Sequence, residues 1–262
     1  MAQIAATPIP TYPDLAGKTA VVTGGSKGIG AATARVLVAN GVRVAVVARD
    51  VESIDRTVAD LGAAGGDVIG VSADCTSLPQ LEDLRTQIEQ RWGALDILIP
   101  FAGGFGPFTP LVDITEGDWR AIIDSNLTST FLTVKAFLPA MIERRSGVIV
   151  TMASNAARVL DIPLTASYAA AKAGIAMFSR HAAKELGQYG IRVNCIAPAT
   201  TLSERVARNL PVERQEGIAA MSPLGRLGTP DDSALATLFL VSDSARWLTG
   251  ITLDVAGGRV MI

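Results

Sequence analysis

The stretch SYAAAK, residues 167–172, places a tyrosine and a lysine four positions apart in a run of alanines. Alanine is the strongest helix former, so a helix is predicted, and residues four apart then share one face. The Tyr168 phenol has an ordinary pKa near 10 and is a poor base at neutral pH. At ~5 Å and an effective dielectric constant near 20, the Lys172 ammonium would attract a phenolate by about 3 kcal/mol. The pair is therefore expected to lower the pKa of Tyr168 by about two units, although inert helices share this spacing.

A glycine-rich turn lies far upstream, in VVTGGSKGIGAA. Gly24, Gly28 and Gly30 follow a predicted strand, 19–24, and open a predicted helix, 28–41. Glycine permits a tight turn and a close approach of a pyrophosphate, and the start of a helix offers free N–H groups. The spacing is not the literal G-x-G-x-x-G fingerprint, yet it predicts the same kind of dinucleotide site.

The second predicted strand ends in VVARD, with Arg49 just after it and Lys27 in the glycine turn. Two cations at the adenosine end suit a 2′-phosphate, which favours NADPH/NADP+ over NADH. Asp50 leaves an alternative, because it could pair with Arg49 or accept a ribose hydroxyl itself. Arg49 could also be a solvated charge at the end of a strand.

Short β-branched runs alternate with helical stretches along the chain. The predicted strands cover 19–24, 43–48, 67–72, 94–100, 147–152, 191–197 and 252–257. The predicted helices cover 28–41, 51–62, 78–91, 116–143, 165–189, 203–220 and 230–241. This pattern predicts an α/β fold of the Rossmann type, a doubly wound sheet of about seven mainly parallel strands with helices on both faces. A single domain over 15–262 would follow an N-terminal arm, 1–14.

The composition restricts the possible partners. The chain has 262 residues, 49% hydrophobic and 18% charged, with a net charge of −2 and no basic block, so nucleic acid is not expected. We expect no membrane span, because no apolar run reaches 18 residues. Cys75 and Cys195 are expected to be free buried thiols, which suits the cytoplasm. His181 is the single histidine, so no His-rich metal cluster is expected.

Four segments occur in the order and approximate spacing of the short-chain dehydrogenase/reductase family: TGGSKGIG, Asn126 in IIDSNLTS, Ser154 in TMASNAA, and YAAAK. VNCIAP and LDVAGG extend the resemblance over about residues 15–259. The chain is similar to the short type of the family, and to the 3-oxoacyl-ACP reductase-like ketoreductases within it. The resemblance implies a carbonyl reductase, an enzyme that transfers hydride between a nicotinamide and a ketone or secondary alcohol.

The resemblance also implies the roles of four residues. Tyr168 would be the general acid in reduction and the base in oxidation. Lys172 would lower its pKa and hydrogen-bond the nicotinamide ribose, and Ser154 would hold the substrate oxygen. Asn126 would lie at a bend in the predicted helix 116–143, where its freed carbonyl would hold a water that leads to Lys172. Ser154 has rivals in Thr151 and Ser167. It lies 14 residues before Tyr168, one more than is usual in the family, which indicates one extra residue in the intervening loop.

Cofactor contacts follow from the same resemblance. Asp74 matches the acidic residue that binds the adenine amino group. The full expected set is Gly24, Ser26, Lys27, Gly28, Ile29, Gly30, Arg49, Asp74, Cys75, Ala102, Gly103, Tyr168, Lys172, Pro198, Thr200 and Ser203. Two segments depart from the family: PFAGG stands where NNAG is usual, and Pro198–Ala199 where Pro-Gly is usual. Pro100 has no N–H to donate, and it cannot make the side-chain hydrogen bonds by which the asparagine of the family connects the central strands. We therefore expect Phe101 to supply packing instead.

Three loops should shape the substrate site: 104–112, 155–165 and 199–222. Apolar surface would come from Phe105, Leu160, Leu164 and Leu202, which favours an apolar ketone or alcohol, such as a 3-oxoacyl compound. Arg158 could meet an anionic substrate or remain solvated. The helices 116–143 and 165–189 and the C-terminal VAGGRVMI resemble the interfaces of the family and imply a homotetramer or a homodimer.

Three hypotheses follow. The first is an NADPH-dependent carbonyl reductase, and the second is an NAD-dependent alcohol dehydrogenase of the same fold. The third is a non-catalytic regulator that senses the cofactor. The presence of all four residues, Asn126, Ser154, Tyr168 and Lys172, argues against the third.

Overall fold

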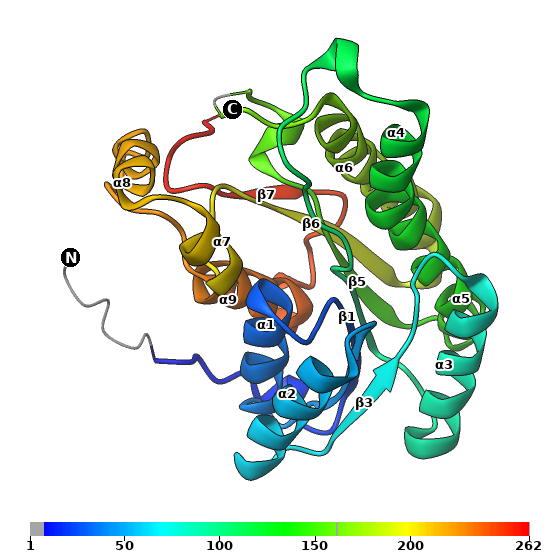
Figure 1. Cartoon of the computed structure of the whole chain (residues 1–262). Helices are drawn as coiled ribbons and strands as arrows, with labels where there is room; N and C mark the ends of the chain where they lie inside the picture. Colours follow the sequence, from blue (N-terminus) through cyan, green and yellow to red (C-terminus); the bar gives the residue numbers. More distant parts are fainter. Residues whose placement is uncertain (1–7, 161, 262) are drawn as a thin grey trace.

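A computed structural model describes residues 8–160 and 162–261, and within them the strands form one seven-stranded sheet in the order β3-β2-β1-β4-β5-β6-β7 (Figure 1). The strands are β1 Thr19–Thr23, β2 Arg43–Ala48, β3 Val68–Ser72, β4 Ile97–Pro100, β5 Gly147–Met152, β6 Ile191–Pro198 and β7 Thr252–Val255. Every neighbouring pair is parallel. The predicted Rossmann-type α/β sheet is confirmed, and it is parallel throughout. The strand order reverses between β1 and β4, the point at which such sheets bind ligands.

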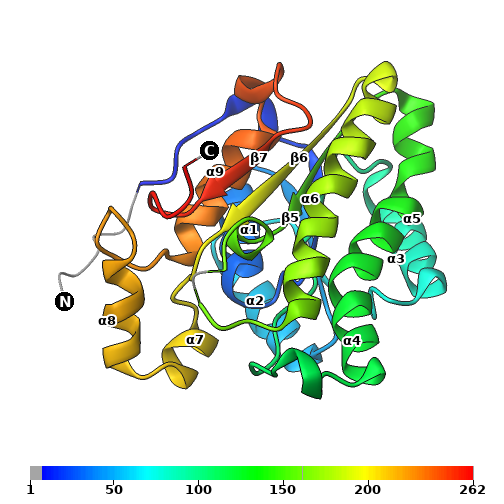
Figure 2. The same ribbon diagram turned by 90° about the horizontal axis from the view of Figure 1, so that it is seen from above.

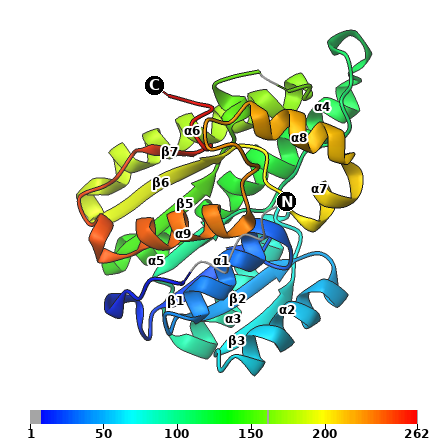
Figure 3. The same cartoon turned by 90° about the vertical axis from the view of Figure 1, so that its left-hand side faces the viewer.

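Helices cover both faces of the sheet (Figures 1 and 3). They are α1 Gly28–Val38, α2 Val51–Ala63, α3 Leu78–Trp92, α4 Glu116–Ile123, α5 Ser129–Arg144, α6 Ala166–Leu186, α7 Glu204–Asn209, α8 Val212–Ala220 and α9 Pro230–Val241. One face carries α1, α2 and α9, and the other carries α3, α4, α5 and α6. Figure 2 shows α7 at the same end of the sheet as the beginning of α4. This end receives the carboxyl ends of the strands.

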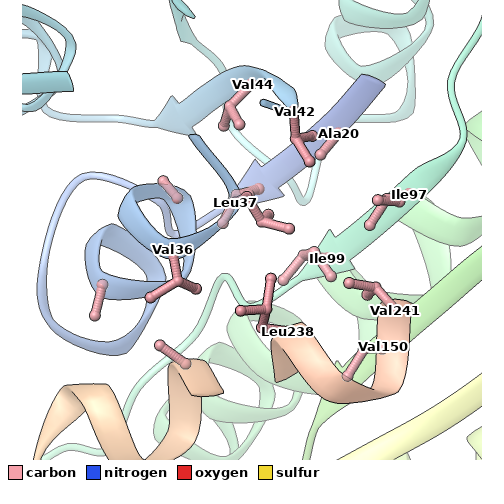
Figure 4. Packing of buried hydrophobic residues seen from close by; sticks show 14 of the residues in the cluster. Ala20, Val36, Leu37, Val42, Val44, Ile97, Ile99, Val150, Leu238 and Val241 are labelled. Atoms are coloured by element: carbon pink, nitrogen blue, oxygen red, sulfur yellow. The ribbon is translucent and has the colours of Figure 1, made fainter. Parts of the chain in front are cut away.

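The strand β1 lies at the centre and is buried along its whole length. Ala20 and Val22 face the α1 and α9 side, where Leu37 and Leu238 complete a core cluster (Figure 4). Val21 points the opposite way, into a second cluster with side chains of α3, α5 and α6. Burial on both faces explains the continuous apolar strands in the sequence.

Two predicted helices are interrupted. The predicted helix 116–143 consists of α4, a π-helical turn over Asp124–Thr128, and α5. The predicted helical stretch 203–220 divides into α7 and α8 at Pro211. Leu210 is extended, with φ −110° and ψ 115°, because the proline ring disfavours helical backbone in the preceding residue.

The predicted N-terminal arm, 1–14, lies partly outside the described residues, which begin at residue 8. Its later part is bound to the domain: the Tyr12 N–H donates to Asn40 Oδ1 at 2.7 Å, and Asn40 Nδ2 donates to the Pro10 carbonyl. Asp14 accepts a hydrogen bond from the Asp243 N–H.

Some features are absent from the described part of the chain. None of its helices combines the length and the apolarity needed to cross a membrane. No group of three or more His, Cys, Asp or Glu side chains in the same residues could hold a metal ion. Cys75 and Cys195 are free and buried, as the sequence predicts.

Candidate active site

The glycine turn between β1 and α1 forms a cradle that side chains would fill. Gly24 and Gly28 have left-handed backbones, with φ of 65° and 55°. A Cβ at Gly30 would overlap the carbonyl oxygen of Gly24. Lys27 precedes the helix without giving it a side-chain cap, so the first N–H groups of α1 remain available to a ligand. The turn therefore fits the pyrophosphate of a dinucleotide.

The cations at the end of β2 have different partners. Lys27 Nζ lies 2.6 Å from Asp50 Oδ2, and this hydrogen bond holds the pKa of Asp50 below its ordinary value. Asp50 therefore pairs with Lys27 and not with Arg49, which was one of its two expected partners, the other being a ribose hydroxyl. Two hydrogen bonds from Thr76 lower the pKa of Asp74. The positive charge of Arg49, which is exposed, lowers it further. Arg49 and Asp74 thus lie near each other at the expected adenosine end, beside buried Cys75.

Tyr168 and Lys172 lie one turn apart near the beginning of α6. The Thr165 hydroxyl caps this helix by accepting from the Tyr168 N–H. The two side chains are 9% and 3% exposed, respectively. Lys172 Nζ lies 5.6 Å from the centre of the Tyr168 ring and donates to the Met152 carbonyl at 2.9 Å. Burial lowers the pKa of Lys172 to about 8.

The predicted lowering of the Tyr168 pKa by Lys172 is wrong for the protein alone. Burial raises the pKa of the phenol, since the phenolate is poorly solvated there. A hydrogen bond with Ser154 opposes this rise, and so does the positive charge of Arg205. Lys172 directs its hydrogen bond to a backbone carbonyl and, being buried itself, loses its proton more easily.

Ser154 follows β5 and is the serine that the fold brings to Tyr168. Its Oγ accepts from the Ala156 N–H at 3.2 Å, and its acceptors Asn155 Oδ1 and Pro198 O are distant, at 3.3 and 3.5 Å. Both hydrogen bonds that the Ser154 hydroxyl donates are therefore weak, and its proton can be offered to a ligand.

The two rivals of Ser154 are held elsewhere. Thr151 Oγ1 lies 2.6 Å from Ser179 Oγ, inside the protein. The Ser167 hydroxyl donates to Thr165 Oγ1. Each hydroxyl is thus used in local structure, which favours Ser154 as the substrate-facing group.

Asn126 lies in the π-helical turn that interrupts the predicted helix at the position of the expected bend. Its side chain is fully buried and binds the loop after β4: Oδ1 accepts from the Gly104 N–H at 3.1 Å, and Nδ2 donates to the Gly104 carbonyl at 2.9 Å. Its own carbonyl accepts from the Thr130 hydroxyl at 2.8 Å. The side-chain clamp on Gly104 is a role that the sequence did not reveal, and the water next to the carbonyl stays a prediction.

The segment PFAGG is shaped by its neighbours. Pro100 pairs in register with Thr23, and Phe101 is buried in the core, which confirms its predicted packing role. The Ala102 N–H donates to Thr23 Oγ1 at 3.1 Å, and this bond holds the segment next to the glycine turn. The other departure, Ala199, continues the β6–β7 ladder by donating its N–H to the Val255 carbonyl.

Of the expected cofactor residues, Ser203 and Thr200 also have defined neighbours. A Cβ at Gly28 would lie 3.6 Å from Ser203 Cβ, so the beginning of α7 lies against the glycine turn. Thr200 Oγ1 accepts a hydrogen bond from Arg259. Pro198 is buried at the end of β6, and its carbonyl faces Ser154.

The expected substrate residues are only partly brought together. The Phe105 ring packs edge-to-face on Tyr168, with centroids 6.0 Å apart. Leu164 and Leu202 are half-buried, whereas Leu160 is 79% exposed. Arg158 matches neither expectation, because it is half-buried in an ion pair with Asp254 at 3.3 Å.

Sequence reasoning missed Arg205. Its guanidinium lies 4.2 Å from the centre of the Phe105 ring, which itself lies on Tyr168. No motif marks this residue, and only the fold brings α7 to the loop after β4. Its position in the predicted substrate loop 199–222 was the one available signal.

Comparisons with known proteins agree with this geometry. The family model described as short chain dehydrogenase matches residues 18–213. A 3-oxoacyl-[acyl-carrier-protein] reductase of Synechocystis is 37% identical over 94% of this chain and 98% of its own length. A cyclohexanol dehydrogenase of Rhodococcus is 38% identical over 93% and 96%. The crystal structure of a 3-oxoacyl-[acyl-carrier protein] reductase from Brucella melitensis with bound NAD has a TM-score of 0.89 at 30% identity, covering 100% of this chain and 99% of that one.

Proposed function

Because this chain belongs to the short-chain dehydrogenase family and is an NAD(P)-dependent oxidoreductase of carbonyl and alcohol substrates, we propose that it works as an NADPH-dependent ketone reductase. One observation carries the proposal: Tyr168, Ser154 and Lys172 form a buried cluster at the end of the sheet that also carries the glycine cradle. A dinucleotide held by its pyrophosphate on α1 would direct its nicotinamide toward this cluster.

Three residues share the proton chemistry in this proposal. Tyr168 gives its phenol proton to the carbonyl oxygen, and its raised pKa keeps the proton in place until a ketone binds. Ser154 donates a hydrogen bond to the same oxygen and stabilises the charge that develops there. Lys172 faces the resulting phenolate from the same side of α6, with N–H groups left for ribose hydroxyls. The nicotinamide supplies the hydride in reduction and accepts it in oxidation.

Arg49 supports the preference for NADPH. It is exposed at the end of β2, next to the expected adenosine site, and a guanidinium binds a phosphate with paired hydrogen bonds. A specific observation favours the alternative, an NAD-dependent alcohol dehydrogenase: Lys27 is already engaged by Asp50 at 2.6 Å. The Brucella relative, moreover, carries NAD in its crystal structure.

Phe105 supports an apolar carbonyl substrate. Its ring packs edge-to-face on Tyr168 and the residue is 42% exposed, so it offers apolar surface next to the tyrosine. We infer that a small cyclic or acyl ketone fits this surface. The names of the relatives, a 3-oxoacyl reductase and a cyclohexanol dehydrogenase, are consistent with such substrates.

We further propose a single catalytic domain over 15–262 that assembles into a homotetramer or a homodimer. An apolar groove between α5 and α6 supports self-association. It is lined by Phe131, Leu138, Ile142 and Phe178, and Phe131 is 43% exposed. The two free, buried thiols suit the reducing cytoplasm, which is the location that we propose.

A panel of ketones and alcohols, followed at the nicotinamide absorbance band, tests the function. We expect ketone reduction with NADPH to have the highest kcat/KM. Faster alcohol oxidation with NAD+ would favour the alternative. Tight cofactor binding without turnover of any member of the panel would contradict both enzymes and favour a sensor.

A further inference from the structure

Arg205 reaches the catalytic cluster from α7. Its side chain lies along the loop after β4, where its Nη1 would be 3.3 Å from a Cβ at Gly104. The guanidinium lies 4.2 Å from the centre of the Phe105 ring, whose edge-to-face partner is Tyr168. Its charge is close enough to lower the pKa of Tyr168 against the effect of burial. A cation therefore stands beside the predicted position of the substrate.

No carboxylate of the described residues lies within ion-pair distance of Arg205. Two other arginines of the predicted substrate loops differ in this respect. Arg158 pairs with Asp254 at 3.3 Å, and Arg208 with Glu204 at 3.9 Å. Glu204 precedes Arg205 directly in the chain, yet the helix turns it toward Arg208. Arg205 is exposed, and no carboxylate of the described residues neutralises its charge.

The orientation of α7 separates this cation from the cofactor cradle. Ser203, at the beginning of α7, lies against Gly28 of the glycine turn. Arg205, two residues later, lies against Phe105 and Gly104, on the substrate side of the same helix. A ligand that Arg205 contacts beside Phe105 would therefore lie next to the ring that packs on Tyr168, where the substrate is expected.

We propose that Arg205 binds a carboxylate of the substrate, so that the preferred substrates are ketones with an acid group at the end of a short apolar chain. This inference rests on the proposed function and deepens it. A guanidinium whose face packs on an aromatic ring still presents N–H groups at its edge. These N–H groups can donate two parallel hydrogen bonds to a carboxylate. Phe105 then packs against the chain between the carbonyl and the acid. The carboxylates of residues 8–160 and 162–261 leave this position open.

The substrate test uses a series of straight-chain keto acids, each paired with its methyl ester, and reduction by the cofactor-loaded enzyme. We expect Arg205→Ala to lower kcat/KM for the best keto acid by about ten- to hundredfold, chiefly through KM, because a charge-assisted hydrogen bond is lost. Reduction of the matched ester should change little. Arg208→Ala is the control, since Arg208 lies on the same helix but is paired with Glu204. It should leave the ratio between acid and ester unchanged.

The outcomes separate the inference from the function on which it rests. If the native enzyme reduces the esters but Arg205→Ala loses acid and ester activity equally, Arg205 has no role in binding the carboxylate, and the ketone reductase still stands. If no ketone of either series is reduced, the proposed function itself fails.

A binding measurement keeps the inference testable without turnover. Thermal shift of the NADP+-loaded protein with hexanoate, and with hexanamide as the neutral match, reports carboxylate binding directly. Hexanoate should stabilise the native protein more than hexanamide does, and Arg205→Ala should abolish this difference. Equal stabilisation of the native protein by both probes would overturn the proposed contact. Arg205→Lys, which keeps the charge without the paired N–H groups, should retain part of the difference.

Discussion

The ammonium of Lys172 lies 5.6 Å from the centre of the Tyr168 ring, one turn along the same face of α6. Both side chains are buried, so each is driven toward its neutral form: the pKa of Tyr168 rises, and that of Lys172 falls to about 8. The protein therefore holds a protonated phenol beside a lysine that is charged at neutral pH. This is the protonation state that ketone reduction requires.

The buried charge of Lys172 should destabilise the fold, and Lys172→Met measures this. The pKa falls from 10.5 to about 8, which corresponds to a cost of about 3 kcal/mol below pH 8. Losing the hydrogen bond to Met152 should offset about 1 kcal/mol of the gain. Urea unfolding at pH 7 should therefore show the variant about 2 kcal/mol more stable, although inactive. The gain should shrink as the pH rises from 8. Above pH 10.5 the lysine is neutral in both folded and unfolded chains, so only the lost hydrogen bond remains and the variant should be about 1 kcal/mol less stable than the native protein.

Lys184→Met is the matched control, because Lys184 is an exposed lysine on the same helix. It should change the free energy of unfolding little at either pH. A lower stability of Lys172→Met at pH 7 would contradict the destabilising role of the buried charge.

Ser154→Ala should lower kcat for ketone reduction by about ten- to a thousandfold, because one preorganised donor to the carbonyl oxygen is lost. The KM for the cofactor should stay near its native value. Ser167→Ala is the control, because Ser167 is also buried but its hydroxyl donates a hydrogen bond to the Thr165 hydroxyl. An equal loss in the two variants would mean that Ser154 acts through the local fold alone.

Arg49→Ala should raise the KM for NADPH about tenfold and leave the KM for NADH nearly unchanged, since only NADPH carries the 2′-phosphate. Arg56→Ala offers a control at an exposed arginine of α2 that pairs with Glu52. Equal KM changes for the two cofactors would remove Arg49 from the phosphate site. An unchanged KM for NADPH would favour the NAD-dependent alternative.

Gly30→Ala should abolish cofactor binding and destabilise the protein, because the new Cβ would overlap the Gly24 carbonyl in the turn. Gly62→Ala is the matched control within a helix, where a Cβ meets nothing within 4 Å. It should leave cofactor binding intact and raise stability slightly. Fluorescence titration with NADPH distinguishes the two. Native-like affinity in Gly30→Ala would mean that the turn can relax, which contradicts a rigid glycine cradle.

The sequence predicted the sheet and the shared helix face of Tyr168 and Lys172 well, because both depend on local patterns. The continuous apolar strands, the glycine turn and the spacing of Tyr168 and Lys172 each follow from neighbouring residues. It also anticipated an irregularity of the helix at Asn126 and the packing of Phe101 in the core.

The contacts that the sequence did not predict join residues that are distant in the chain. Arg158 meets Asp254, and Arg205 meets Phe105, only after the sheet has brought their loops together. The Tyr168 pKa was missed for a related reason. The Coulomb attraction of one lysine can be estimated from its spacing, whereas the desolvation that outweighs it depends on everything packed around the ring.

The most direct test of the central claim, that Tyr168 delivers the proton in ketone reduction, is single-turnover oxidation of bound NADPH by Tyr168→Phe. Phenylalanine keeps the ring that packs on Phe105 and removes only the hydroxyl. We predict a loss in rate of about a hundred- to ten-thousandfold, with an unchanged dissociation constant for NADPH. A rate within a few-fold of the native enzyme would contradict the claim and show that the proton comes from another group.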